Sequence, residues 1–120
     1  MESQAREIWV LGHANLLQQV FLNLFLNGMN AMVNGGVLKI WVEKTSSEAV
    51  VCISDTGAGI AKQDLERIFD PFFTSALVGK GTGLGLSICH SIIAKQHLGK
   101  IEGESEEGVG STFRVFLPIF

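Results

Sequence analysis

The chain has 120 residues, of which 47% are hydrophobic and 18% are charged, and its formal net charge is −3. These proportions are typical of one globular domain with its own core and exclude an intrinsically disordered chain. Because the balance is acidic and the sequence contains no basic stripe, it also argues against a nucleic acid partner.

The predicted elements form an α/β arrangement. A short strand is predicted at residues 7–11, a long helix at 14–33, and two strands at 37–43 and 49–53. A short helix at 62–69, a long connection without a periodic pattern at 70–82 and a second long helix at 84–97 follow. Two closing strands are predicted at 100–105 and 111–117. We therefore expect a two-layer α/β sandwich, with a mixed, mostly antiparallel sheet and about three helices on one face.

Neither the cysteines nor the most apolar segment indicates a secreted or membrane-embedded chain. Cys52 and Cys89 lie in apolar runs without metal-ligand spacing, so we expect buried free thiols in a reducing compartment, with a disulfide as the less favoured alternative. Residues 16–33 contain five asparagines and glutamines, too many for a bilayer span. We expect a cytoplasmic location without direct membrane contact. We also expect a single domain over residues 1–120, trimmed from a larger parent that can itself be membrane-anchored.

A glycine stands at every second position from Gly79 to Gly85, directly before an apolar helical pattern. Such a run lets backbone N–H groups converge on a phosphate at a helix N-terminus, so a nucleotide is the first ligand to consider. The commoner nucleotide motifs are excluded. Gly81 follows Lys80 where a P-loop requires Ser or Thr, and no strict G-x-G-x-x-G follows a strand. The histidines are expected at the surface or at helix ends rather than in catalysis.

Three asparagines share one face of the first predicted helix. Asn23, Asn27 and Asn30 fall at i, i+4 and i+7, beside an apolar face that would pack on the sheet. A solvated polar face is the simpler interpretation, but such a face normally carries Lys or Glu, and residues 14–33 contain neither. The alternative is a row of amides facing a hydrated Mg²⁺ and phosphates, because Mg²⁺ accepts neutral oxygen ligands.

Asp55 follows a predicted buried strand and precedes the glycines of the loop at residues 55–60. A carboxylate in that position can accept a hydrogen bond from the exocyclic amine of adenine. Asp and Gly are also ordinary turn residues, and a plain turn is the favoured interpretation of this segment when it is taken alone.

Together, these segments resemble the ATP-binding catalytic domain of sensor histidine kinases, in the superfamily shared with gyrase, Hsp90 and MutL. Residues 23–31 (NLFLNGMNA) look like the N box, 55–60 (DTGAGI) like the G1 box, 69–74 (FDPFFT) like the F box and 81–87 (GTGLGLS) like the G2 box. Residues 108–113 (GVGSTF) resemble the final glycine-threonine block. Five motifs in family order cover about residues 10–118 and imply the Bergerat-type fold of this superfamily.

The resemblance implies roles for these residues. Asp55 would bind the adenine amine with help from Thr112 through water, Asn27 would ligate Mg²⁺, and Asn23 would contact phosphate or metal-bound water. Residues 74–82 would form a flexible ATP lid with an aromatic base. The residues implied to bind ATP and Mg²⁺ are Asn23, Asn27, Asn30, Asp55, Gly57, Gly59, Ile60, Phe72, Lys80, Gly81, Thr82, Gly83, Leu84, Gly85 and Thr112, and the implied catalytic residues are Asn23, Asn27 and Lys80.

One position separates the subclasses of the superfamily. In the ATP-hydrolysing relatives, a glutamate four residues before the metal asparagine activates water, whereas here that residue is Asn23, whose amide cannot take up a proton. The sequence therefore favours phosphoryl transfer over hydrolysis. The usual basic residues beside the metal asparagine and after the double aromatic are missing. Lys80 is therefore the expected phosphate partner, with a solvated loop lysine as the alternative.

We accordingly expect the catalytic domain of a histidine kinase from a two-component system. It would transfer the γ-phosphoryl group of ATP to a histidine on a separate helical dimerisation domain, and through that domain it would act indirectly on a response regulator. No phosphoacceptor histidine is expected in the 120 residues. A gyrase- or Hsp90-type ATPase and a non-catalytic nucleotide-binding module stay open as alternatives.

Overall fold

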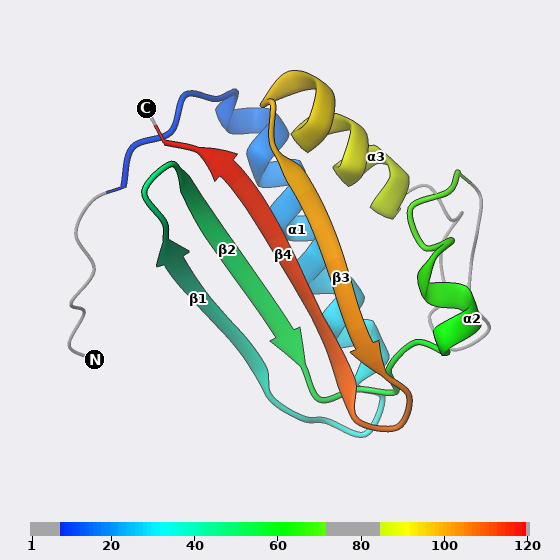
Figure 1. The fold of residues 1–120 in the computed structure, drawn as a ribbon. Coiled ribbons are helices and arrows are strands. Elements are labelled where there is room, and N and C mark those ends of the chain that lie inside the picture. Colours follow the sequence, from blue (N-terminus) through cyan, green and yellow to red (C-terminus); the bar gives the residue numbers. More distant parts are fainter. Residues whose placement is uncertain (1–7, 72–84, 120) are drawn as a thin grey trace, which may run out of the picture.

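The computed structural model describes residues 8–71 and 85–119, and its strands form one four-stranded sheet. The elements in chain order are α1 (Ala14–Ala31), β1 (Leu38–Lys44), β2 (Glu48–Asp55), α2 (Lys62–Leu65), α3 (Gly85–Ser91), the π-helix η1 (Ile92–Gln96), β3 (Lys100–Glu106) and β4 (Gly110–Pro118). The strand order is β1-β2-β4-β3, so the last strand of the chain lies inside the sheet (Figure 1).

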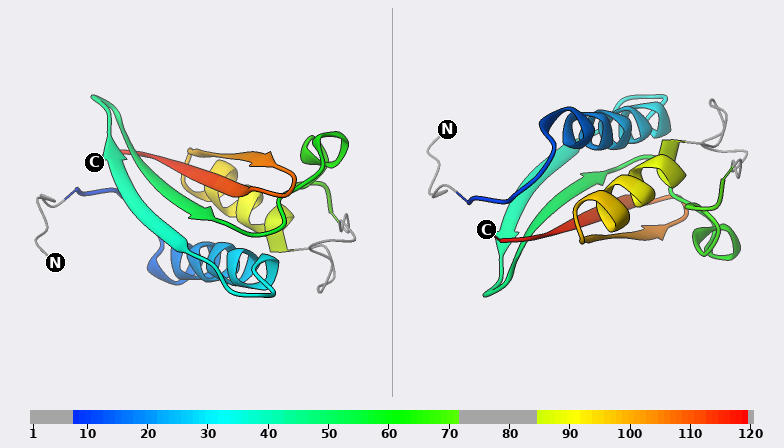
Figure 2. Two further views of the ribbon diagram at one scale, coloured as in Figure 1. Left: turned by 90° about the horizontal axis from the view of Figure 1, so that it is seen from below. Right: turned by 90° about the horizontal axis from the view of Figure 1, so that it is seen from above.

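The helices α1 and α3 pack side by side on the same face of the sheet, as both views in Figure 2 show. The predicted two-layer sandwich is confirmed. Every described strand pair is antiparallel, so this sheet is not mixed. Each strand contributes alternate residues to the helix-covered face, because side chains along a strand point to opposite sides.

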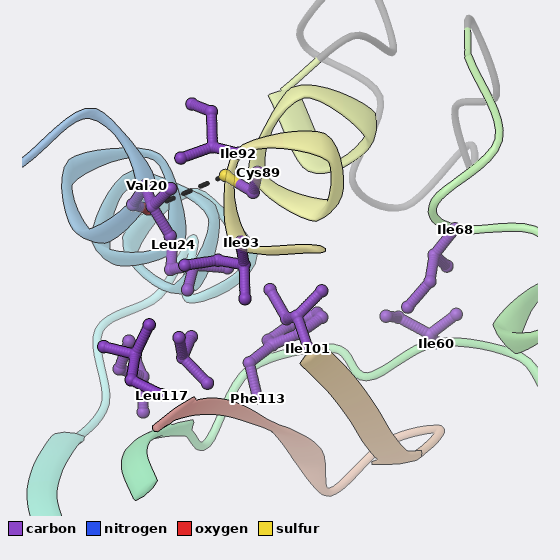
Figure 3. Packing of buried hydrophobic residues seen from close by; sticks show 12 residues of the cluster. Val20, Leu24, Ile60, Ile68, Cys89, Ile92, Ile93, Ile101, Phe113 and Leu117 are labelled. Atoms are coloured by element: carbon purple, nitrogen blue, oxygen red, sulfur yellow. Dashed lines mark hydrogen bonds between the residues drawn. The ribbon is translucent and has the colours of Figure 1, made fainter. Parts of the chain in front are cut away.

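The core fills the space between the helices and the sheet (Figure 3). Val20 and Leu24 from α1 meet Cys89 from α3 and Ile93 from η1, and all four side chains are at most 1% exposed. Ile101, Phe113 and Leu117 close the core from the sheet. The core therefore joins elements from both ends of the sequence. The apolar faces of α1 and of the α3–η1 segment depend on the sheet for their burial.

Three element predictions need correction. The strand predicted at residues 7–11 does not form in the described part, where Val10 makes only an isolated bridge to Ile119. The helix predicted at 62–69 ends at Leu65 and continues as turns, because the backbone N–H groups of Arg67 and Asp70 donate three residues back, to the carbonyl oxygens of Asp64 and Arg67, instead of four. Within the predicted helix 84–97, the described residues form α3 and then η1.

His97, the residue that follows η1, forms two hydrogen bonds through its ring. Its Nδ1 lies 3.1 Å from the carbonyl oxygen of Ile92, and its Nε2 accepts the backbone N–H of His13 at 2.9 Å. With one ring nitrogen donating and the other accepting, the imidazole is neutral in this arrangement. This buried side chain therefore ties the end of the second helical segment to the residue that precedes α1.

Candidate functional site

Asp55 is the last residue of β2 and is only 7% exposed. Its Oδ1 accepts the backbone N–H of Gly57 at 2.9 Å. Burial raises the pKa of the Asp55 carboxyl, and backbone N–H groups of Gly57 and Ser111 partly oppose that rise. A buried carboxylate at the end of a strand, with one oxygen held by a turn, is a preorganised hydrogen-bond acceptor rather than an ordinary surface turn residue.

Gly28 brings α1 close to this carboxylate. A Cβ at Gly28 would lie 2.8 Å from Leu38 Cδ1 and 3.6 Å from Asp55 Oδ2, so it would crowd the end of the Leu38 side chain and stand in van der Waals contact with Asp55. Gly28 is not among the predicted site residues. The available signal is a glycine in the interior of a helix, which costs about 1 kcal/mol relative to alanine and so indicates a close approach.

The glycines of the 55–60 loop are required by packing. A Cβ at Gly57 would lie 2.5 Å from the Ala31 carbonyl oxygen, and one at Gly59, whose φ is +75°, would lie 2.3 Å from the Glu106 carbonyl oxygen. The backbone N–H of Ala58 donates to Ala31 at 3.1 Å, and that of Gly108 donates to Ala58 at 2.7 Å. The loop is therefore held between the end of α1 and the β3–β4 turn.

The asparagine stripe is present on α1, with different environments along it. Asn23 and Asn27 are half-buried, whereas Asn30 is exposed. The Asn23 Nδ2 donates weakly to the Cys89 sulfur at 3.8 Å, and that thiol donates to the Val20 carbonyl at 3.7 Å. Within the part of the chain that the structure describes, the Asn27 side-chain amide has no hydrogen-bond partner, so its oxygen is available to a ligand.

The two cysteines are free and buried, as predicted. Burial raises the pKa of the Cys89 thiol to about 11, with the Asn23 amide opposing the rise. The thiol beside Asn23 is therefore protonated at neutral pH.

Ser111, rather than Thr112, shares the helix-covered face with Asp55. In the β2–β4 register, Asp55 pairs with Ser111 and Ser54 pairs with Thr112. The Thr112 hydroxyl lies 2.9 Å from the Ser54 hydroxyl on the opposite face of the sheet. A pocket of about 530 Å³ at this end of the sheet is lined from both faces, by Asp55 and Ser111 as well as by Thr112. The sequence analysis named Thr112 at this place and not Ser111.

The other predicted residues fall into two groups. Ile60 is 4% exposed and belongs to the core, whereas Gly85 begins α3, and a Cβ there would have no heavy atom of the described residues within 4 Å. The remaining predictions lie outside the described residues: the lid at 74–82, Phe72, Lys80, Gly81, Thr82, Gly83 and Leu84.

The described residues offer neither a membrane span nor an acidic or thiol metal cluster. In residues 8–71 and 85–119, no helix is both long and apolar enough to cross a membrane. In those same ranges, no group of three or more His, Cys, Asp and Glu side chains gathers as a metal site. A cation at α1 would thus depend on amide oxygens, water and the ligand itself.

Comparison with known proteins gives one consistent result. Residues 12–120 match the family model described as histidine kinase-, DNA gyrase B- and HSP90-like ATPase. The chain is 46% identical over 108 residues to sporulation kinase C of Bacillus subtilis, and 42% identical over 103 residues to the sensor histidine kinase ZraS of Escherichia coli K12. These alignments cover 90% and 86% of this chain but only 24% and 22% of the relatives.

Solved structures agree with the sequence relatives. The nucleotide-free catalytic domain of histidine kinase ThkA superposes with a TM-score of 0.80 at 38% identity, over 91% of this chain and 71% of that one. A mycobacterial sensor histidine kinase, MprB, gives a TM-score of 0.83 at 27% identity, over 92% and 76% of the two chains.

Proposed function

Because the chain belongs to the family of histidine kinase-, DNA gyrase B- and HSP90-like ATPases, we propose that it is the ATP-binding catalytic domain of a sensor histidine kinase. The observation that carries this proposal is the buried Asp55 carboxylate, facing α1 at the end of β2. Its acceptor oxygens suit the exocyclic amine of adenine. Ser111, next to it on the same face, takes the supporting role that the sequence assigned to Thr112.

The residues on α1 fit a magnesium-bound triphosphate. Asn27 offers an unpaired amide oxygen, Asn23 lies one turn before it, and Mg²⁺ accepts such neutral ligands while keeping several waters. When bound, the ion would supply charge neutralisation at the phosphates. The chain itself would bind and orient the nucleotide. The role of Lys80 as a phosphate partner stays a prediction.

Phosphoryl transfer is favoured over hydrolysis by the groups around Asn23. A hydrolase needs a general base there, yet the Asn23 amide cannot accept a proton and the adjacent Cys89 thiol has a pKa of about 11. We propose that the acceptor is a histidine on a separate helical dimerisation domain, and that the chain acts in the cytoplasm. A response regulator would be reached only through that domain.

Binding of Mg-ATP by isothermal calorimetry tests the proposal. We expect Asn27→Ala to lose affinity and Asn15→Ala, at an exposed position on the same helix, to retain it. Equal affinity in the wild type and Asn27→Ala would contradict the assigned site.

Phosphotransfer requires a second measurement, with a phosphoaccepting helical domain supplied in trans and labelled ATP. Labelled phosphohistidine on that domain supports a kinase. Steady phosphate release by this chain alone would instead indicate an ATPase, and bound ATP without either product would indicate a nucleotide-binding module.

A further inference from the structure

Ser105, which lies outside every motif described above, occupies the centre of a hydroxyl network beside Asp55. It is on β3, paired with Ser111 of β4, and its side chain is half-buried. Its Oγ lies 2.7 Å from the backbone N of Ile60, 2.9 Å from the carbonyl oxygen of Gly110 and 2.8 Å from the Ser111 Oγ.

The partners of Ser105 fix the direction of each hydrogen bond. The Ile60 N–H can only donate, and the Gly110 carbonyl can only accept. Since a hydroxyl has a single proton, Ser105 donates to Gly110 and accepts from Ile60. The remaining bond must then run from the Ser111 O–H to the Ser105 Oγ, because Ser105 has no second proton to give.

This arrangement determines what Ser111 offers to a ligand. The only hydroxyl proton of Ser111 is donated to Ser105. Towards a ligand, the Ser111 oxygen can therefore act only as a hydrogen-bond acceptor. Asp55, its partner across the β2–β4 register, also presents acceptor oxygens. The two side chains therefore favour a donor on the ligand, reached directly or through one water.

Purines differ at the 6-position in whether they donate or accept a hydrogen bond. A 6-amino purine donates from that position, whereas a 6-oxo purine presents a carbonyl oxygen that can only accept. Two groups that cannot donate leave such a carbonyl unpaired, and a buried polar group without a partner lowers affinity.

We propose that Ser105 is a specificity-determining positioning residue. By holding the Ser111 proton, it makes the site prefer 6-amino over 6-oxo purine nucleotides. This inference rests on the proposed function, since it concerns the base of the same nucleotide. Ser105 acts through Ser111 and does not need to touch the ligand.

The test compares dissociation constants for Mg-ATP and Mg-ITP, which carries the 6-oxo group, in the wild type and three variants. In Ser105→Ala, the Ser111 hydroxyl is free to donate, so the preference for ATP over ITP should fall by about fivefold, the effect of one neutral hydrogen bond. Ser46→Ala, in the exposed β1–β2 turn, should leave the preference unchanged. Ser111→Ala removes the acceptor and should also reduce the preference.

The outcomes separate this inference from a structural role. If Ser105 only supports the loop through Ile60, both nucleotides lose affinity by the same factor and the preference persists, which overturns the proposal. If Ser105→Ala does not fold, an unchanged preference in Ser111→Ala overturns it equally. If the wild type binds ATP and one of these two results is found, the specificity role of Ser105 is overturned but the proposed function is not. If the wild type binds no ATP, the proposed function itself is refuted.

Discussion

Replacing Asp55 by asparagine tests base recognition while keeping the shape of the side chain. The asparagine Oδ1 can still accept the Gly57 N–H at 2.9 Å, but its amide nitrogen then faces the adenine amine with donors instead of an acceptor. The interaction lost is a hydrogen bond to a charged group, worth about 1.5–3 kcal/mol. The dissociation constant for Mg-ATP should therefore rise by about 10- to 100-fold.

The same substitution should not weaken the fold at neutral pH. Burial raises the folded-state pKa of Asp55 above its ordinary value of 3.8, so the ionised carboxylate lowers the free energy of unfolding. In the pH range between 3.8 and the raised pKa, the folded chain binds more protons at this residue than the unfolded chain. Wild-type stability at this residue therefore increases as the pH falls through that range, and the neutral amide of Asp55→Asn lacks this dependence.

Calorimetry with Mg-ATP and urea unfolding across the acidic range measure the two effects separately. We expect weaker binding, with a free energy of unfolding at neutral pH that equals or exceeds that of the wild type. Two results would refute the reasoning: an unchanged dissociation constant, or losses of affinity and stability that run in parallel, since the latter would make Asp55 a structural residue.

Three further substitutions, the last with a matched control, probe the backbone and the core. Gly110→Ala places a Cβ 2.0 Å from the Asp55 carbonyl oxygen, so urea unfolding should show a loss of about 1–3 kcal/mol together with weaker ATP binding; wild-type stability would contradict that contact. A Cβ at Gly85 meets no heavy atom within 4 Å in the part of the chain that the structure describes, so in Gly85→Ala the melting temperature should be kept while ATP affinity falls, and unchanged affinity would remove Gly85 from the site. Leu24→Ala should cost about 2–5 kcal/mol in urea unfolding because the side chain is 1% exposed, whereas Leu22→Ala, at 55% exposure, should cost less than about 0.5 kcal/mol; similar values for both would contradict the core.

The sequence is sufficient for the order of most elements and for the motif segments, because apolar periodicity and glycine-rich turns are local signals. It is insufficient where a residue's role depends on a distant partner. The sequence places Asp55 in a loop, yet pairing with Ser111 extends β2 to include it. The sequence does not decide which of the neighbours Ser111 and Thr112 lies beside Asp55. Because successive side chains of a strand point to opposite faces of the sheet, a shift of one residue changes the face.

Other features need three-dimensional neighbours. His97 is buried where its ring contacts the Ile92 carbonyl and the backbone N–H of His13, a residue 84 positions earlier in the chain than His97. Apolar periodicity in the sequence does not indicate such a distant contact. Gly28 is explained only by the proximity of Leu38 and Asp55. The strand predicted at 7–11 fails for the opposite reason, since among the residues that the structure describes a favourable local pattern there finds only a single bridge to Ile119.

The position of β4 inside the sheet has a consequence for biosynthesis. During translation, Asp55 emerges long before Ser111, and β3 has no neighbour in the sheet until β4 inserts between it and β2. A nascent chain therefore cannot assemble the proposed nucleotide pocket gradually, and pairing across such sequence distances is slow to form. Ribosome stalling or premature termination before residue 110 would leave a chain without β4, in which neither the closed core nor the proposed binding site could form.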